Sequence, residues 1–224
     1  MTSTQQLSML AGANCQVAFD NLTRQLYATD ASIYQIQPLA VAFPRNSRQT
    51  SALVRAALQA DVSVTPRGAG TGLAGGALGD GLVIDFSRYQ RQITELDLER
   101  HTVRVGPGVV LDHLNNFLRP HGFCFGPDVA TSSRATLGGM IANNSSGSHT
   151  PFYGTTADHI RELEVVMADG RVVEVGPEHD TLRKERELLE DLVHLHSLTI
   201  AERMPPGLLK RWPGYALDRC ARIE

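Results

Sequence analysis

The sequence predicts an α+β fold made of two α/β lobes. The first lobe is indicated by an apolar run at 40–43, an amphipathic helical pattern at 47–58 and a second apolar run at 62–64, which together form a strand–helix–strand unit. The second lobe is indicated by two pairs of segments with alternating apolar and polar residues, which lie between residues 93 and 175. Such a mixture of strands and helices favours packed α/β layers over an all-helical or all-strand fold.

Local signals place the elements of the first lobe. Pro44 ends the strand at 40–43, because the residue before a proline avoids helical geometry. Asn46 or Ser47 caps the helix at 47–58, since both side chains can accept a hydrogen bond from a free N–H of the first turn. Two further elements are predicted in this half of the chain, a helix over 16–27 and a strand over 82–86.

Turn residues place the elements of the second lobe. Asp169-Gly170 is a strong turn dipeptide and predicts a hairpin between strands at 163–167 and 171–175. The remaining predicted elements are strands over 93–98 and 102–105 and helices over 110–118 and 182–198.

A glycine-rich loop from Pro66 to Gly76 joins two predicted strands and is the most informative stretch. Five of the nine residues from Gly68 to Gly76 are glycine, so few side chains stand between the backbone and a ligand. Several N–H groups of such a loop can face one anion, and Thr71 and Arg67 add a hydroxyl and a positive charge. The loop predicts a phosphate or pyrophosphate site, with a flexible surface turn as the alternative.

Two common phosphate motifs do not fit this loop. A P-loop requires a lysine after its glycines, and the only lysines are Lys184 and Lys210. The dinucleotide fingerprint G-x-G-x-x-G matches at Gly70, Gly72 and Gly75, but it must open a helix whose N-terminus faces the pyrophosphate. Here the loop leads into a strand, which argues against an NAD-binding Rossmann site.

A second segment of small and polar residues, from 126 to 147, has the composition of a ligand-binding wall. No residue from Ala135 to Ala157 is formally charged if His149 is neutral, but Gly, Ser, Asn and Thr dominate the stretch and exclude a membrane span. Backbone donors and hydroxyls beside apolar residues suit a large flat ligand with polar and apolar parts.

Together the two segments resemble the FAD-binding domain of the vanillyl-alcohol oxidase superfamily, the PCMH-type fold. Within it they are most similar to the FAD-linked D-2-hydroxy-acid dehydrogenases, the branch of D-lactate, glycolate and D-2-hydroxyglutarate dehydrogenases. The order and spacing of the blocks agree from about residue 35 to 176. The blocks are Phe43-Pro44-Arg45, Pro66 to Gly76, Val103 to Gly108, Gly126-Pro127-Asp128, Ala135 to Asn143, Tyr153-Gly154 and Ala168-Asp169-Gly170.

The resemblance implies FAD held between the two lobes, with the first loop on its pyrophosphate and the second segment along its length. The positions that correspond to the family's cofactor-binding residues are Arg67, Gly68, Ala69, Gly70, Thr71, Gly72, Asp128, Ser132, Thr136, Gly138, Gly139 and Asn143. Some relatives attach the flavin to a histidine just after the first glycines. Gly72-Leu73 is followed by neither His nor Cys, which implies non-covalent FAD.

The resemblance places no catalytic residue in this chain. In the family a cap domain supplies the substrate carboxylate clamp, the histidine base and any metal ligands, and none of its blocks is present. His149 carries an imidazole that could act as an acid–base group, but a lone histidine in a polar loop is more often structural. We therefore expect a C-terminally truncated FAD-binding portion, with any iron–sulfur cluster located downstream.

Composition and cysteine spacing exclude other classes. The net charge of −3 and the dispersed arginines give no reason to expect nucleic acid or an anionic membrane as partner, and no signal peptide or integral membrane segment is expected. Cys15, Cys124 and Cys220 lie far apart without metal spacing, which indicates a reducing, cytoplasmic setting and no metal site.

The implied reaction of the whole enzyme is oxidation of a small D-2-hydroxy acid to a 2-oxo acid by hydride transfer to the flavin, with an unknown electron acceptor. Two alternatives stay open: a truncated non-catalytic flavin-binding or scaffold module, and a same-fold NADPH-dependent flavin reductase. An unfinished lobe would expose strand edges, so a homo-oligomer is expected. The expected parts are a helical lead-in at 1–36, a lobe with the pyrophosphate loop at 37–90, a second lobe at 91–180 and an incomplete helical segment at 181–224.

Overall fold

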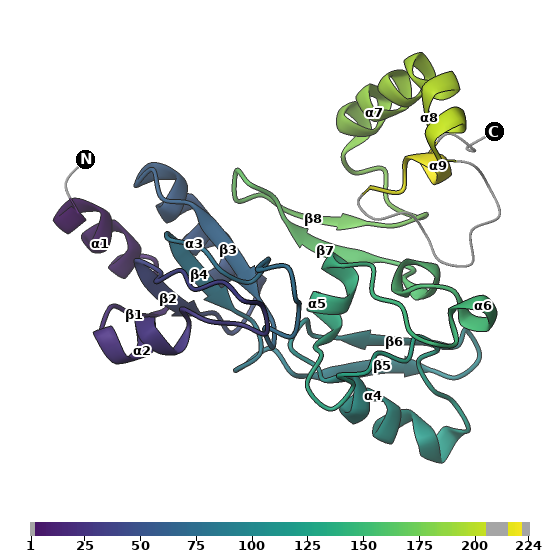
Figure 1. Cartoon of the computed structure of the whole chain (residues 1–224), viewed down its shortest axis with the longest axis horizontal. Coiled ribbons are helices and arrows are strands. Elements are labelled where there is room, and N and C mark those ends of the chain that lie inside the picture. The colour runs from purple at the N-terminus through teal and green to yellow at the C-terminus, as the bar shows by residue number, and fades with distance from the viewer. Residues whose placement is uncertain (1–2, 205–214, 221–224) are drawn as a thin grey trace.

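The computed structural model describes residues 3–204 and 215–220. Its first lobe is a four-stranded sheet flanked by helices (Figure 1). The strand order is β1-β2-β4-β3; β1 is antiparallel to β2, and the other three strands are parallel. The elements of this lobe are α1 (Ser3–Ala11), β1 (Gln16–Ala18), α2 (Asn21–Leu26), β2 (Ala40–Phe43), α3 (Ser47–Gln59), β3 (Val64–Arg67) and β4 (Leu82–Asp85).

The two central strands of this sheet are buried on both faces. All four residues of β2 and all four of β4 are buried, as expected for parallel strands covered on two sides. On one face, Leu10 of α1 and Leu53 of α3 pack against Leu82 and its neighbours, and α1 contacts α3. On the other face, Tyr27 at the end of α2 packs against a small cluster around Phe43.

The helix predicted at 47–58 is confirmed. The Asn46 side chain accepts a hydrogen bond from the Gln49 N–H at 2.9 Å, so Asn46 is the N-cap. The helix predicted over 16–27 is wrong in its first part. Val17 lies in β1 and pairs with Ala42 of β2, and the helix begins only after Asp20, which caps α2 by accepting from the Thr23 N–H.

The strand predicted at 62–64 begins later than expected and includes a proline. Residues from Val64 to Arg67 pair with β4, with Pro66 opposite Ile84. Proline is tolerated because β3 is the edge strand of the sheet, where one row of N–H groups needs no partner strand.

The second lobe contains two separate two-stranded antiparallel sheets, β5-β6 and β7-β8. A second apolar core, separate from that of the first lobe, joins α4 and α5 through Leu114, Leu118, Leu137 and Met140. The elements of this lobe are β5 (Ile93–Asp97), β6 (Thr102–Val105), α4 (Leu111–Leu118), a 3₁₀ turn (Arg119–His121), α5 (Leu137–Ala142), α6 (Thr150–Tyr153), a second 3₁₀ turn (Thr156–His159), β7 (Leu163–Val166) and β8 (Val172–Val175).

The turn of the β7-β8 hairpin is fastened to the first lobe. Gly170 takes a positive φ of 79° in that turn, as the Asp-Gly dipeptide predicts. Its carbonyl accepts hydrogen bonds from Ser51 Oγ at 2.5 Å and Arg55 Nη2 at 3.2 Å, both on α3. The hairpin therefore extends from α3 across the second lobe (Figure 1).

The C-terminal helices lie beside the β7-β8 hairpin, where Arg171 pairs with Glu185 at 3.1 Å, and away from the four-stranded sheet (Figure 1). The single helix predicted over 182–198 is divided at His196 into α7 (Arg183–Leu195) and α8 (Ser197–Arg203), and α9 (Leu217–Cys220) contacts both. Residues 205–214 and 221–224 of the helical segment expected at 181–224 lie outside the described residues.

Candidate cofactor cradle

The glycine-rich loop leaves the carboxyl end of β3 and returns to the amino end of the parallel strand β4 without an intervening helix. This strand–loop–strand connection agrees with the rejection of a Rossmann site, which would need a helix at this point. Gly70 and Gly75 have positive φ values of 66° and 74°, a conformation that favours glycine. The loop is therefore held in a specific turned shape at the carboxyl end of the sheet.

Arg67 fixes one side of this loop through backbone contacts. Its guanidinium donates to the carbonyl oxygens of Thr29 at 2.9 Å, Ala77 at 3.4 Å and Tyr27 at 3.5 Å. A Cβ at Gly70 would meet that guanidinium. The Arg67 donors thus join the 27–30 segment to both ends of the loop, and the cofactor contact predicted for this side chain stays a prediction.

The two predicted cofactor segments meet where Gly68 faces Thr136. A Cβ at Gly68 would collide with Thr136 Oγ1 and would come within 3.8 Å of the Gly139 N–H. Gly68 follows β3 of the first lobe, and Thr136 precedes α5 of the second. The structure therefore brings together Gly68, Thr136 and Gly139, three of the residues for which the sequence predicts a cofactor contact.

Thr136 also carries an unsatisfied polar atom. The residue is 2% exposed, and its Oγ1 has no hydrogen-bond partner among the described residues. A buried hydroxyl without a partner costs about 1–3 kcal/mol, so such an atom beside a glycine-rich loop fits a site that an added ligand completes. Gly72 and Gly76 have open space where a Cβ would stand, which leaves room for that ligand along the loop.

The other predicted positions of the second segment bond within the chain. Asn143 Nδ2 donates to the Gly139 carbonyl at 2.9 Å, and the Ser132 carbonyl accepts from the Asp112 N–H at 3.1 Å. Asn143 thus supports the turn after α5, and Ser132 supports the start of α4. The structure records no hydrogen bond from either residue to the first loop, so their cofactor roles stay predictions.

Asp128 holds the 147–149 turn. It accepts hydrogen bonds from Ser148 Oγ at 2.8 Å, from the His149 N–H at 3.1 Å and from His149 Nδ1 at 2.5 Å. The Ser148 hydroxyl, followed by the two His149 donors, lowers the pKa of the Asp128 carboxyl to about 2. The Asp128 carboxylate thus holds His149 in place within this turn.

Two residues that the sequence did not indicate also border the loop. Asp30 accepts from the Ser32 N–H at 2.8 Å through Oδ1, while its buried Oδ2 has no partner among the described residues. The ring of Tyr34 lies 2.9 Å from the position that a Cβ at Gly75 would occupy. Asp-x-Ser is a common turn pattern, so nothing in the sequence distinguishes this segment from an ordinary turn; only the fold brings it to the glycine loop.

Within residues 3–204 and 215–220, no group of His, Cys, Asp or Glu side chains is arranged to hold a metal ion. None of the helices in this described part is long and apolar enough to cross a membrane.

Residues 38–176 match the family described as FAD binding domain. Over 153 residues the chain is 44% identical to a D-2-hydroxyglutarate dehydrogenase of Pantoea ananatis. The aligned region covers 67% of this chain and 15% of that protein. The chain is 43% identical over 157 residues to the D-2-hydroxyglutarate dehydrogenase of Escherichia coli, with 69% and 15% covered. The chain therefore spans about 15% of the length of these curated relatives.

Solved structures with the same fold are chains much longer than this one. The xylooligosaccharide oxidase of Myceliophthora thermophila matches with a TM-score of 0.69 and 26% identity, covering 79% of this chain and 38% of that one. The 6-hydroxy-D-nicotine oxidase of Arthrobacter nicotinovorans matches with a TM-score of 0.66 and 22% identity, covering 75% and 37%. The predicted PCMH-type fold and the resemblance to FAD-linked D-2-hydroxy-acid dehydrogenases are both confirmed, and the chain belongs to the FAD-binding domain family.

Proposed function

We propose that this chain is the FAD-binding portion of a flavin-dependent dehydrogenase that oxidises a small D-2-hydroxy acid to a 2-oxo acid. The observation that carries the proposal is the buried, unpartnered Thr136 hydroxyl where the glycine loop of one lobe meets the second lobe. The substrate class is supported by the 44% and 43% identity to two D-2-hydroxyglutarate dehydrogenases.

In this proposal each segment has a distinct task in holding FAD. The backbone N–H groups from Gly68 to Gly72 bind the pyrophosphate, as a turned glycine loop can. The Thr136 hydroxyl and the backbone of Gly138 and Gly139 contact the flavin and its ribityl chain. FAD, when bound, supplies the hydride acceptor; the protein supplies position and exclusion of water.

Substrate binding, proton removal and electron transfer to the acceptor are assigned to parts of the enzyme that this chain does not span. The described residues hold the cofactor, so binding without turnover is the expected activity of residues 1–224 alone. We place the protein in the cytoplasm, because the described residues hold free thiols at Cys15, Cys124 and Cys220 and persistent disulfides are typical of oxidising compartments.

A titration with FAD, followed by flavin fluorescence, tests this proposal. Saturable binding is expected, and ADP should displace FAD because both carry the pyrophosphate and adenosine that the loop would hold. Riboflavin, which lacks the pyrophosphate, should bind more weakly than FAD. Absence of saturable FAD binding, or FAD binding that ADP does not disturb, would contradict the assignment of the loop.

A further inference from the structure

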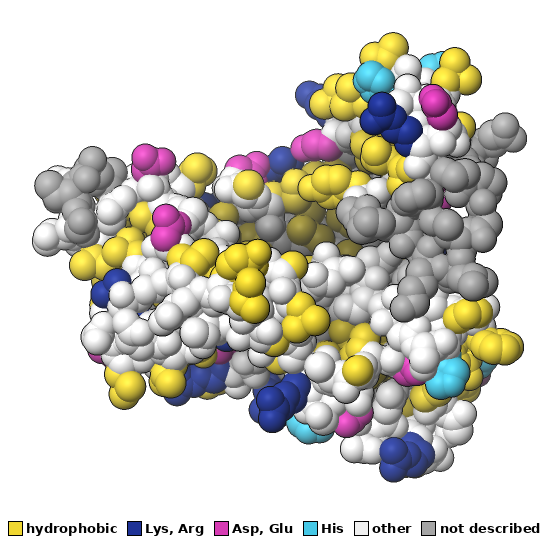
Figure 2. All heavy atoms as spheres, in the orientation of Figure 1, with side chains coloured by type: hydrophobic (Ala, Val, Ile, Leu, Met, Phe, Trp, Pro, Cys, Tyr) yellow, Lys and Arg dark blue, Asp and Glu magenta, His cyan; other side chains and the backbone are white. Residues whose placement is uncertain are grey.

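One face of the four-stranded sheet carries arginines beside aromatic rings. The guanidinium carbon of Arg88 lies 4.7 Å from the centroid of the Phe43 ring, and that of Arg67 lies 5.2 Å from the centroid of the Tyr27 ring. Both rings take part in the apolar cluster on this face. Figure 2 shows Lys and Arg side chains along the lower edge of the first lobe. An acid on this face therefore lies among positive charges.

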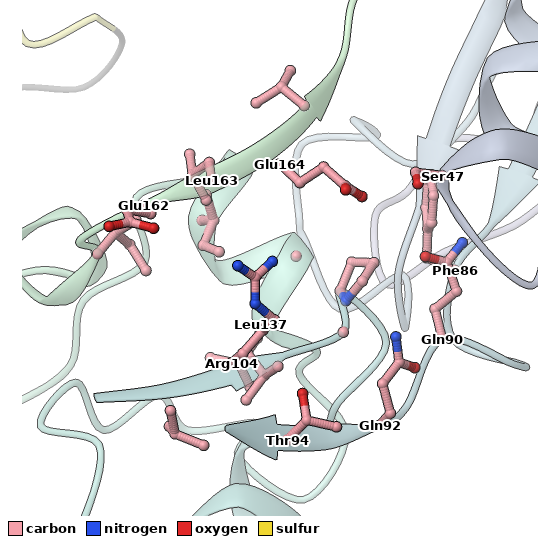
Figure 3. A pocket seen from close by; sticks show the side chains of 18 of the residues that line it. Ser47, Phe86, Gln90, Gln92, Thr94, Arg104, Leu137, Glu162, Leu163 and Glu164 are labelled. Carbon is pink, nitrogen blue, oxygen red and sulfur yellow. The ribbon is translucent and has the colours of Figure 1, made fainter. Parts of the chain in front are cut away.

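The carboxyl end of β4 places such an acid there. Phe86, which follows the strand, lines a cavity between the two lobes (Figure 3). Asp85 lies on the opposite face, like Val83 two residues before it, because side chains alternate along a strand. Asp85 is only 3% exposed, and a buried carboxylate is stable only when it is paired or hydrogen-bonded.

Two donors satisfy this carboxylate. The Tyr27 hydroxyl donates to Asp85 Oδ2 at 2.5 Å, and the Ser87 N–H donates to Oδ1 at 2.6 Å. Burial, followed by the hydrogen bond to Asp85, raises the pKa of Tyr27, so its hydroxyl stays protonated and remains a donor. The Tyr27 ring packs edge-on against Phe43, with 5.9 Å between the centroids. The hydroxyl and the carboxylate are therefore held in one arrangement.

Arg67 lies beside this pair but forms no ion pair with it. Arg67 and Asp85 are opposite each other in the register of β3 and β4, so their side chains leave the same face of the sheet, and the strands are only ~4.8 Å apart. Even so, every contact of the Arg67 guanidinium with an oxygen that is recorded among the described residues is with a neutral carbonyl. Two opposite charges on neighbouring strands are thus kept apart, with Tyr27 next to both.

The separated positive charge lies against the glycine loop. Arg67 Nη2 is 2.8 Å from the position that a Cβ at Gly70 would occupy. A guanidinium paired with a carboxylate has no net charge with which to attract an anion, whereas an unpaired one attracts a pyrophosphate on the loop. The state of Asp85 therefore bears on how strongly the loop attracts an anion.

We propose that Tyr27 is a positioning residue for the cofactor pyrophosphate: its hydroxyl holds the Asp85 carboxylate away from Arg67, so that the guanidinium keeps its charge for the glycine loop. This inference rests on the proposed function, because the anion is the pyrophosphate of FAD. Tyr27 acts through Asp85 and Arg67 and does not itself touch the cofactor.

Fluorescence titrations with FAD and with riboflavin test the proposal on residues 1–224. Tyr27→Phe keeps the ring but frees Asp85 to pair with Arg67, so the FAD Kd should rise about tenfold. The riboflavin Kd should stay within about twofold, because riboflavin has no pyrophosphate. Adding Asp85→Asn to Tyr27→Phe removes the competing charge and should restore the FAD Kd. A purely structural role would weaken both ligands, and Asp85→Asn would restore neither; that result overturns the proposal.

Tyr89→Phe is the matched control. Tyr89 lies on the same face, with the Arg45 guanidinium carbon 3.8 Å from its ring centroid, but its hydroxyl is hydrogen-bonded to the neutral Gln16 side chain at 3.0 Å. Loss of this hydroxyl frees no carboxylate, so the FAD Kd should not change. An equal rise in the FAD Kd for Tyr89→Phe and Tyr27→Phe would contradict the role of Asp85.

A mutant cycle in urea unfolding tests the charge separation without any ligand. The cycle combines Arg67→Gln with Asp85→Asn, once in the unsubstituted chain and once in the Tyr27→Phe chain. The coupling between the two charges, as a ratio of unfolding equilibrium constants, should be about fivefold larger in the Tyr27→Phe chain. Equal coupling in both chains overturns the inference, whether or not FAD binds. If the coupling differs but the unsubstituted chain binds no FAD, the proposed function fails and the charge separation stands.

Discussion

At the residue scale, the proposed cradle contains a hydroxyl that the folded chain leaves without a partner. Thr136 is buried at the contact between the two lobes, and its Oγ1 makes no hydrogen bond among the described residues. The sequence predicted Thr136 as a cofactor residue through its resemblance to a family. Only the structure shows its isolation, because Gly68, which lies 68 positions earlier, closes the site around it.

Thr136→Val should separate cofactor binding from stability. Loss of one hydrogen bond to FAD is worth about 0.5–1.5 kcal/mol, or roughly a 2- to 12-fold increase in the FAD Kd. The free energy of unfolding without FAD should rise by up to about 1 kcal/mol, because an unpaired buried hydroxyl is removed. Fluorescence titration and urea unfolding measure the two quantities.

Thr50→Val is the matched control for this substitution. Thr50 is also buried, but its hydroxyl donates to the Asn46 carbonyl at 3.2 Å in α3. The control should lose about 1 kcal/mol of stability and keep its FAD Kd. If Thr136→Val instead lost stability and kept its affinity, the hydroxyl would be structural.

The lowered pKa of Asp128 predicts that the free energy of unfolding decreases at acid pH. Its pKa is lowered from 3.8 to about 2 by Ser148 and His149. A carboxylate with a lowered pKa in the folded state stabilises the fold above the unfolded pKa, and this contribution is lost as the pH falls from about 4 to about 2. Between these values the free energy of unfolding should fall more steeply for the unsubstituted chain than for Asp128→Asn, in urea titrations at each pH. Parallel slopes would mean that the bonds to the 147–149 turn contribute nothing to stability.

At the element scale, local patterns predicted the elements that carry their own signals. The helix α3 has a capping side chain at Asn46 and an apolar face, and the β7-β8 hairpin has Asp169-Gly170 at its turn. Segments whose state depends on distant partners were predicted poorly. Val17 is part of a strand because Ala42 pairs with it. Nothing in the amino-acid sequence of residues 16–27 indicates that pairing.

The short helix α5 shows the same limit at the proposed cofactor site. It contains Gly138 and Gly139, which have low helix propensity, and the sequence indicated a turning wall there. Leu137 and Met140 are buried in the second core, and this packing holds the helical turn. The composition of the site was therefore predictable, whereas its backbone conformation followed from tertiary contacts.

The open space beside two glycines of the loop leads to a prediction for their substitution. A Cβ added at Gly72 or at Gly76 would have no neighbouring atom within 4 Å, so Gly72→Val and Gly76→Val should each change the free energy of unfolding by less than about 0.5 kcal/mol. Gly72 belongs to the proposed pyrophosphate site and Gly76 does not. FAD affinity should fall at least tenfold for Gly72→Val and stay near the original value for Gly76→Val. Equal effects in a fluorescence titration would contradict the placement of the pyrophosphate.

At the scale of the whole molecule, two apolar cores and the hydrogen bonds from α3 to the β7-β8 turn hold the two lobes that form the proposed site. Each lobe has its own apolar cluster, and the Gly170 carbonyl joins the β7-β8 turn to α3. The sequence predicted two lobes with a cofactor between them. It also predicted the two pairs of strands in the second lobe, but not that these pairs form separate sheets, because pairing between distant strands leaves no local signal.

The central claim, that these residues form an FAD cradle, is tested most directly by a visible absorbance spectrum. The purified chain would be measured as isolated, and again after incubation with FAD and desalting. A flavin spectrum that survives desalting, and that Gly72→Val weakens, is the predicted result. A colourless protein that loses all added FAD, while the chain remains folded by circular dichroism, would contradict the claim that residues 1–224 hold the cofactor.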